Sequence, residues 1–187
     1  MDFELPREIK MLQNLVRKFV EQELIPIEMQ VNHQEEIADE VLRPLQEKAK
    51  RLGLWLLDVP KEYGGLGLGL LARCVVREEV AKTKALPFRH NELFGPIVGP
   101  ILYEANAEQR ERFLLPVLRG ELRVCFAQSE PDAGTDPASM RTRAVRQGDH
   151  YILNGTKRWI TGADKADYAQ VICLTDPEKR ARGGISC

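Results

Sequence analysis

The sequence has almost no excess charge of either sign: 27 lysines and arginines face 28 aspartates and glutamates, for a formal net charge of −1. Nucleic acids and anionic membrane surfaces attract proteins through a positive charge that this chain does not have. Apolar runs also stay short of the ~18 residues that a membrane-spanning helix requires. The opening residues, MDFELPREIK, match neither a signal peptide nor a transit peptide. We therefore expect neither nucleic acid nor a membrane as a partner.

Cysteine and histidine are scarce and scattered. The four cysteines form no C-x-x-C pair, and the three histidines (His33, His90 and His150) lie far apart in the sequence. This pattern argues against a zinc site and favours reduced, mostly buried thiols in a reducing compartment. We therefore expect a cytoplasmic protein without a bound metal.

The first two-thirds of the chain is typical of helices. Apolar residues at helical spacing predict helices over 5–26, 38–53, 70–84 and 107–121. Pro26 is expected to end or kink the first helix, and Asp39 to cap the second, which Gly53 stops. Asn106 and Gln109 have the spacing of a capping box. The glycine-rich segment EYGGLGLG (62–69) fits neither phosphate-loop nor dinucleotide templates and predicts a turn between helices.

Strand patterns begin near residue 121. LRVCFAQ and DYAQVICLTD predict strands, and Gln147-Gly148-Asp149 predicts a turn. Asn154-Gly155 predicts a hairpin between HYIL and TKRWIT, which would place Trp159 and Thr161 on one face of a strand. The expected fold is therefore α+β: an all-α helical domain over 1–120, then the start of an antiparallel β domain over 121–187. A domain with so few strands leaves apolar surface exposed. We therefore expect either that the chain is truncated or that a partner chain covers this surface.

The loop SEPDAGTD (129–136) supports two interpretations. Its small polar residues bond local backbone readily, so a structural turn would explain them. Gly134 beside Thr135 would equally let a ligand approach the main chain. Glu130 and Asp136 could form an acid/base pair, although a solvated or capping role is favoured because no partner base is visible. Trp159 and Thr161 fit either a support for a flat ring or ordinary core positions.

Three segments together resemble the acyl-CoA dehydrogenase family: VPKEYGGLGL, AQSEPDAGTDPAS and YILNGTKRWITGA. They occur in the family's order and approximate spacing. The resemblance covers the entire chain but only about the first half of a family member: the N-terminal helical domain and part of the middle β domain, which carries the flavin loop. It implies an FAD-dependent flavoprotein of fatty acid metabolism that dehydrogenates an acyl-CoA thioester to a 2-enoyl-CoA.

The resemblance also implies roles for individual residues. The Ser129 hydroxyl is expected to bond the polar edge of the flavin, the Trp159 indole to pack on the ring, and Thr161 to bond near its redox-active nitrogen. Thr135 is expected to contact the thioester substrate as well. Gln128 stands where the family more often has a small apolar residue, and Thr135 where it often has serine; neither change is expected to prevent binding. The full set of expected cofactor-binding residues is Phe126, Ala127, Gln128, Ser129, Gly134, Thr135, Trp159, Ile160 and Thr161.

The family's catalytic glutamate belongs to a region outside this chain, so no catalytic residue is transferred and the chain alone is expected to be inactive. The implied partners are an acyl-CoA substrate, an electron-transfer flavoprotein as electron acceptor and, at full length, further copies in a homo-oligomer. Alternatives within the fold are an acyl-CoA oxidase or a flavin monooxygenase. An alternative of another class is a non-catalytic binding or scaffold protein.

Overall fold

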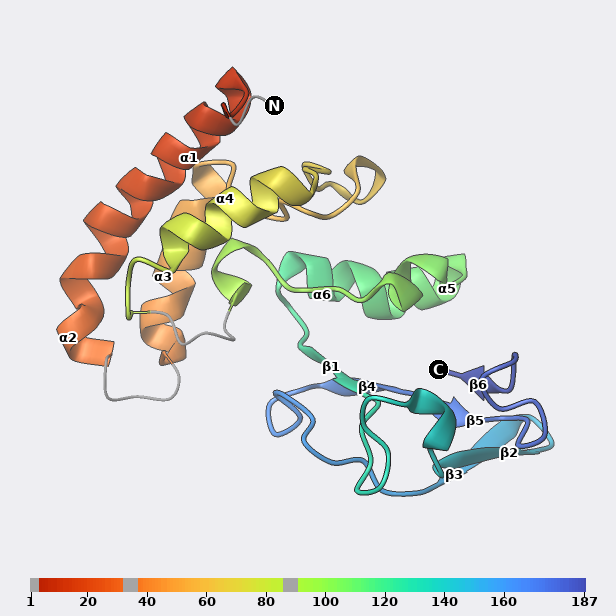
Figure 1. Ribbon diagram of the computed structural model, residues 1–187. Helices are drawn as coiled ribbons and strands as arrows, with labels where there is room; N and C mark the ends of the chain where they lie inside the picture. The colour runs from red at the N-terminus through yellow and green to blue at the C-terminus, as the bar shows by residue number, and fades with distance from the viewer. Residues whose placement is uncertain (1–3, 32–36, 86–90) are drawn as a thin grey trace. The chain divides into compact units, whose positions relative to one another are not determined.

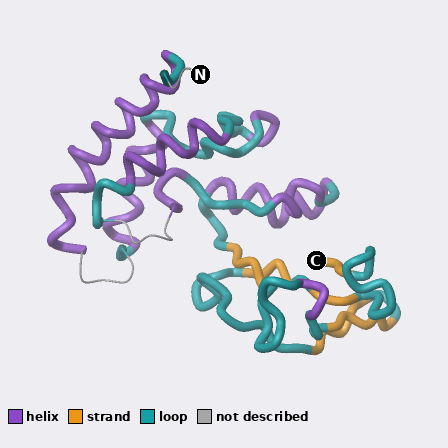
Figure 2. Tube along the Cα trace, viewed as in Figure 1, coloured by secondary structure: helices purple, strands orange, loops and turns teal. Residues whose placement is uncertain are grey.

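The computed structural model describes residues 4–31, 37–85 and 91–187. The chain divides into two compact units, Met1–Val98 and Gly99–Cys187, and each is described by itself. The described residues of the first unit form helices, and every described strand lies in the second unit (Figure 2). Helices followed by strands confirm the expected fold class. The domain boundary at 120/121 stays a prediction.

The described residues of the first unit form four α-helices and short helical turns (Figure 1); α1, α3 and α4 lie within the predicted helices, whereas the short α2 was not predicted. They are α1 (Arg7–Phe19), α2 (Glu28–Val31), α3 (Asp39–Arg51) and α4 (Leu70–Val80). A wide helical turn, Val20–Leu24, and a tight one, Ile25–Ile27, join α1 to α2. The regular α pattern thus ends at Phe19 and resumes at Glu28, two residues after Pro26, which has no N–H to donate.

The start of α3 differs from the prediction by one residue. Ala38, in an extended conformation, is the capping residue, and Asp39 is the first residue of the helix. A carboxylate in the first turn still favours the helix electrostatically. The predicted stop at Gly53 is confirmed, since its φ of 71° lies in the left-handed region.

The glycine-rich connector joins α3 to α4, as predicted. Its central residue Gly65 passes so close to the main chain of Val59 that an added Cβ would lie 2.0 Å from the carbonyl oxygen. Only glycine fits there. A large apolar cluster forms the core of this unit: Val16, Phe19, Val20, Leu24, Val31, Ile37, Leu42, Leu45, Ala49, Leu54, Leu57, Val76, Ala85 and Leu93.

The second unit begins with helical segments and continues with six strands. The helical segments before the first strand are a tight turn (Pro100–Glu104), α5 (Ala107–Gln109), a wide turn (Arg110–Leu114) and α6 (Leu115–Arg119). The strands are β1 (Val124–Ala127), β2 (Arg143–Gln147), β3 (His150–Asn154), β4 (Tyr168–Val171), β5 (Cys173–Leu174) and β6 (Ile185–Ser186). The predicted capping box is confirmed: Asn106 Oδ1 accepts the Gln109 amide at 2.8 Å, and Gln109 Oε1 accepts the Asn106 amide at 3.1 Å.

Strand pairing in this unit is mixed rather than purely antiparallel. β2 pairs antiparallel with β3, and β5 with β6, whereas β1–β4 and β2–β5 are parallel. Two sheets result, β1-β4 and β3-β2-β5-β6. A small cluster of Ala133, Met140, Ile172 and Leu174 packs between loop and strand residues.

The predicted hairpin at Asn154-Gly155 is wrong. The observed hairpin joins β2 to β3 through Gly148, the other predicted turn, and β3 ends at Asn154. An added Cβ on Gly155 would lie 2.3 Å from Thr142 Oγ1, so this glycine serves a close backbone approach instead of a turn. Residues 156–161 form no strand, and the expected alternation of Trp159 and Thr161 on one face of a strand is therefore also wrong.

Two further expectations concern the cysteines and the membrane. All four cysteines are free thiols; Cys125 and Cys173 are buried, while Cys74 and Cys187 are exposed. Among the described helices, none combines the length and the apolar character needed to cross a bilayer. His33 and His90 lie outside the described residues.

Candidate functional site

The loop SEPDAGTD starts where β1 ends. Ala127, the last residue of β1, is buried, and its carbonyl accepts the Ile172 amide at 3.0 Å. Its neighbour Phe126 points away from this packing and is 46% exposed. Strand alternation thus buries one side chain and leaves an aromatic ring accessible beside the loop.

The loop then closes into a tight turn. The Glu130 amide donates to the Ala133 carbonyl at 2.8 Å, and the Ala133 amide returns a bond to the Glu130 carbonyl at 3.3 Å. Gly134 and Thr135 follow the turn and are exposed. Asp136 then accepts the Ala138 amide at 2.9 Å and the Ser139 hydroxyl at 2.6 Å, which confirms its capping role.

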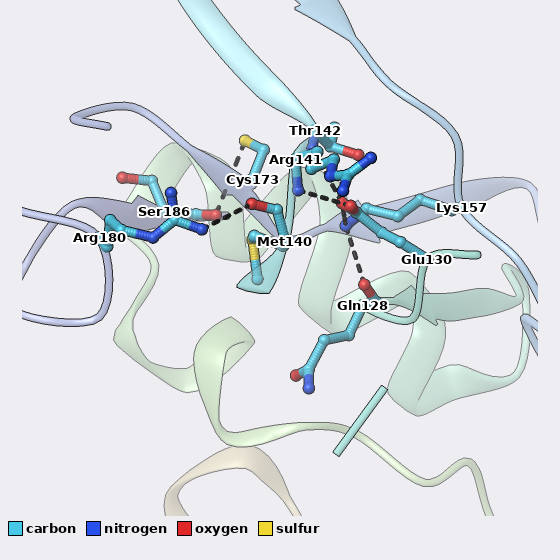
Figure 3. A network of polar contacts seen from close by, with 9 residues as sticks. All are labelled: Gln128, Glu130, Met140, Arg141, Thr142, Lys157, Cys173, Arg180 and Ser186. Carbon is cyan, nitrogen blue, oxygen red and sulfur yellow. Dashed lines mark hydrogen bonds and ion pairs between the residues drawn. The ribbon is translucent and has the colours of Figure 1, made fainter. Parts of the chain in front are cut away.

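Glu130 is buried, so of the two roles expected for it, solvated or capping, the solvated one is wrong. Its carboxylate accepts hydrogen bonds from Lys157 Nζ at 2.8 Å and from the amides of Arg141 at 2.6 Å and Thr142 at 3.0 Å (Figure 3). Burial alone would raise the pKa of Glu130, but these hydrogen bonds outweigh it and lower the pKa to about 2. A carboxylate with such a low pKa is a poor general base near neutral pH.

Besides the bond from Lys157 to Glu130, two further hydrogen bonds join the loop region to the segment that carries Trp159. Lys157 Nζ donates to the Gln128 carbonyl at 2.9 Å (Figure 3), and the Arg158 amide donates to the Ser129 carbonyl at 2.9 Å. The structure therefore brings together Gln128 and Ser129 with residues 157 and 158, directly before the expected Trp159–Thr161 group. Gly134 and Thr135 are not among the residues that these bonds join.

Trp159 has an unusual conformation. Its φ of 62° lies in the left-handed region, which a bulky side chain rarely adopts, and its side chain is 79% exposed. The Arg158 guanidinium lies 4.2 Å from the centre of the indole. Ile160 is half-buried and Thr161 is exposed. The exposed Trp159 indole excludes the core interpretation of this tryptophan.

These residues fit a planar heteroaromatic cofactor such as the flavin of FAD. Phe126 and Trp159 offer accessible apolar rings, and half-buried Ser129 offers a hydroxyl in the loop that is hydrogen-bonded to the segment before Trp159. Within the described part of the chain, no cluster of three or more metal-ligating side chains is present.

The sequence reasoning missed Lys157 and the position of Glu130. The two residues are 27 positions apart, and no local pattern links them. Lys157 follows Gly155 closely and precedes Trp159 in the sequence, and this context does not predict that its side chain is buried.

Two family models match the chain. One, described as "Acyl-CoA dehydrogenase, N-terminal domain", matches residues 6–121, and the other, "Acyl-CoA dehydrogenase, middle domain", matches residues 125–187.

Individual relatives agree with these matches. The chain is 39% identical over 186 residues to the mitochondrial short-chain specific acyl-CoA dehydrogenase of Homo sapiens, covering 96% of this chain and 43% of that protein. A solved structure of glutaryl-coenzyme A dehydrogenase with glutaryl-CoA is 33% identical, with a TM-score of 0.79, over 100% of this chain and 47% of that one. A structure of the electron transferring flavoprotein of Acidaminococcus fermentans is 30% identical, with a TM-score of 0.75, over 100% of this chain and 48% of that one. The chain thus spans about half the length of the relatives it matches.

Proposed function

The chain belongs to the acyl-CoA dehydrogenase family, and we propose that it supplies one wall of the flavin and thioester site of an FAD-dependent acyl-CoA dehydrogenase. The proposed reaction is the α,β-dehydrogenation of an acyl-CoA thioester to a 2-enoyl-CoA. Bound FAD would supply the hydride acceptor, a role that amino-acid side chains do not fill.

One observation carries this proposal: the loop after β1 and the Trp159 segment are hydrogen-bonded to each other. The bonds from Lys157 to Gln128 and from Arg158 to Ser129 join the two segments that the family resemblance assigns to the flavin. Beside them, the rings of Phe126 and Trp159 are exposed. Accessible aromatic surface next to fixed polar groups is what a flat, partly polar cofactor requires.

Each side chain has a proposed part in binding. Ser129 would bond the polar edge of the ring, Trp159 would cover a face of it, and Thr161 would orient it. Thr135 would contact both the cofactor and the thioester. Phe126, Ala127, Gln128, Gly134 and Ile160 complete the proposed binding set.

No residue of this chain is assigned as the base that removes the α-proton. Glu130 and Asp136 each directly follow a residue of the proposed wall, yet Glu130 has a pKa of about 2 with its oxygens engaged by Lys157 and two amides, and Asp136 caps Ala138 and Ser139. The proposed role of the chain is therefore to bind, orient and shield, and the proton abstraction is left to a group outside it.

The wider setting is part of the same proposal. We propose an acyl-CoA as substrate, an electron-transfer flavoprotein as acceptor, a homo-oligomeric assembly, a role in fatty acid metabolism and a cytoplasmic location. We also propose that the chain divides into a helical domain (1–120) and a β domain (121–187).

Tryptophan fluorescence tests the proposal directly. The sequence has two tryptophans, so Trp55→Phe leaves Trp159 as the reporter. We expect added FAD to quench this fluorescence saturably, because the flavin would stack on the indole. Trp159→Ala should weaken FAD binding about tenfold or more, the range expected for loss of a stacked aromatic ring.

The matched control is Trp55→Phe, which should leave the affinity for FAD unchanged. Equal affinity of wild type and Trp159→Ala would contradict the proposed site. If flavin binds, rapid reaction of its reduced form with O₂ in stopped flow would favour an oxidase or monooxygenase over a dehydrogenase. If wild type takes up no FAD, the result would favour a non-catalytic binding or scaffold protein over a flavoprotein.

A further inference from the structure

A buried ion pair joins the two segments assigned to the flavin. Glu130 Oε1 lies 2.8 Å from Lys157 Nζ, and the side chains are only 5% and 12% exposed (Figure 3). Both charges have left water almost completely, which is costly unless the geometry is good and the remaining polar atoms are satisfied.

The partners of the pair meet that condition. The carboxylate also accepts the amides of Arg141 and Thr142, and the ammonium also donates to the Gln128 carbonyl at 2.9 Å. One position along, the Arg158 amide donates to the Ser129 carbonyl. Three consecutive residues, 128–130, are thereby bonded to two consecutive residues, 157 and 158.

We propose that Glu130 and Lys157 are positioning residues that fix Ser129 and Trp159 relative to each other for flavin binding. This inference rests on the proposed function. Neither side chain need touch the cofactor: each acts through its neighbour in the sequence, Glu130 through Ser129 and Lys157 through Arg158 and Trp159.

A role in positioning explains features that stability alone does not. Apolar residues of similar volume often replace a buried ion pair without loss of stability, so burial of the pair is weak support for a purely stabilising role. Trp159 also has a φ of 62°, a conformation that persists only where the surroundings determine it. The bonds of Lys157 and Arg158 immediately before it are such a determinant.

The test compares FAD affinity and the visible absorbance of bound flavin among variants. Glu130→Gln should weaken FAD binding about tenfold and shift the flavin spectrum towards that of free FAD. Lys157→Met should do the same, and Lys157→Arg, which keeps the cation, should recover part of the affinity. The matched control is Asp132→Asn on the same turn. Asp132 forms an ion pair with Arg141 at 3.0 Å, and both side chains are exposed to solvent. This control should bind FAD like wild type.

A second measurement does not need the flavin. Amide hydrogen exchange at Arg158 reports its bond to the Ser129 carbonyl in the protein without FAD. Glu130→Gln should accelerate exchange there at least tenfold more than it accelerates exchange in β2 and β3.

The outcomes separate the two proposals. If wild type binds FAD and Glu130→Gln binds it equally well, the positioning role is overturned. Exchange that rises evenly throughout the second unit also overturns it, because the pair would then be a general stabilising element. If wild type binds no FAD, the proposed function fails, and local acceleration at Arg158 still supports the coupling of the two segments, whereas unchanged exchange rejects it.

Discussion

The first unit (Met1–Val98, the helical unit) and the second unit (Gly99–Cys187, the β unit) each bury a glutamate that is paired with a cation, but in different surroundings. In the helical unit, Glu79 of α4 accepts bonds from Arg17 of α1 at 2.9 and 3.2 Å and from Lys82 at 2.6 Å. In the β unit, Glu130 lies in a loop and is bonded by Lys157 and by two backbone amides. The first carboxylate joins side chains; the second organises the main chain.

The two regions differ in the interactions that would still stabilise them if the carboxylate were removed. Helices satisfy their own amides, and the packing of α1 against α4 is supported by a large apolar cluster. The loop around Glu130 has a cluster of only four buried residues nearby, and its amides at Arg141 and Thr142 depend on the carboxylate. Polar contacts therefore determine loop geometry in the β unit, whereas apolar packing dominates in the helical unit.

The largest expected effect comes from removing one lysine in each unit. Lys157→Met leaves the Glu130 carboxylate buried without its cation, which should cost about 3–5 kcal/mol of the free energy of unfolding of the β unit. Lys82→Met in the helical unit should cost about 1 kcal/mol, because Lys82 is half-exposed and Arg17 still pairs with Glu79. Native-state amide exchange measures both losses unit by unit. Equal losses would mean that the two carboxylates are supported alike.

The sequence predicted what depends on neighbours in the chain. The capping box of Asn106 and Gln109 and the turn at Gly148 follow from residues a few positions apart, and the structure confirms both. The Asn154-Gly155 hairpin failed because the close approach of Thr142 to Gly155 is a long-range contact. Local patterns could not anticipate that contact.

For the candidate site, local chemistry left the SEPDAGTD loop undecided between a structural turn and a binding loop. The family resemblance, rather than periodicity, singled out Ser129 and Trp159. Neither source identified the pair of Glu130 and Lys157, because an ion pair between residues 27 positions apart leaves no trace in a local pattern.

An intermediate effect is expected on acidification, and here the two units should respond alike. Bonds from Arg17, followed by those from Lys82, lower the pKa of Glu79 to about 2 despite its burial. Burial would raise the pKa of Glu130, but its hydrogen bonds lower it to about 2 as well. With an ordinary value of 4.5, each carboxylate adds about 3 kcal/mol of stability above pH ~4.5, which is lost as pH falls towards 2.

The sign follows from proton binding: between these pH values the unfolded chain binds protons that the folded chain does not. Stability measured by amide exchange over this range should therefore fall in both units. Glu79→Gln should flatten the fall in the helical unit and Glu130→Gln in the β unit. An unchanged pH dependence in either variant would contradict the corresponding low pKa.

The smallest expected effect concerns helix ends, where the two units differ again. The helical run that starts at α5 has a capping box, whereas the described N-cap residues of α1, α3 and α4 (Pro6, Ala38 and Gly69) make no side-chain capping bond. Asn106→Ala should therefore cost about 1 kcal/mol, because the Gln109 amide loses its acceptor. Ala38→Ser is the matched opposite, since residue 38 already has the extended conformation of a cap, and it should add about 0.5–1 kcal/mol to the helical unit. Urea unfolding followed by circular dichroism measures both changes, and a loss from Asn106→Ala without a gain from Ala38→Ser would show that packing alone determines where α3 begins.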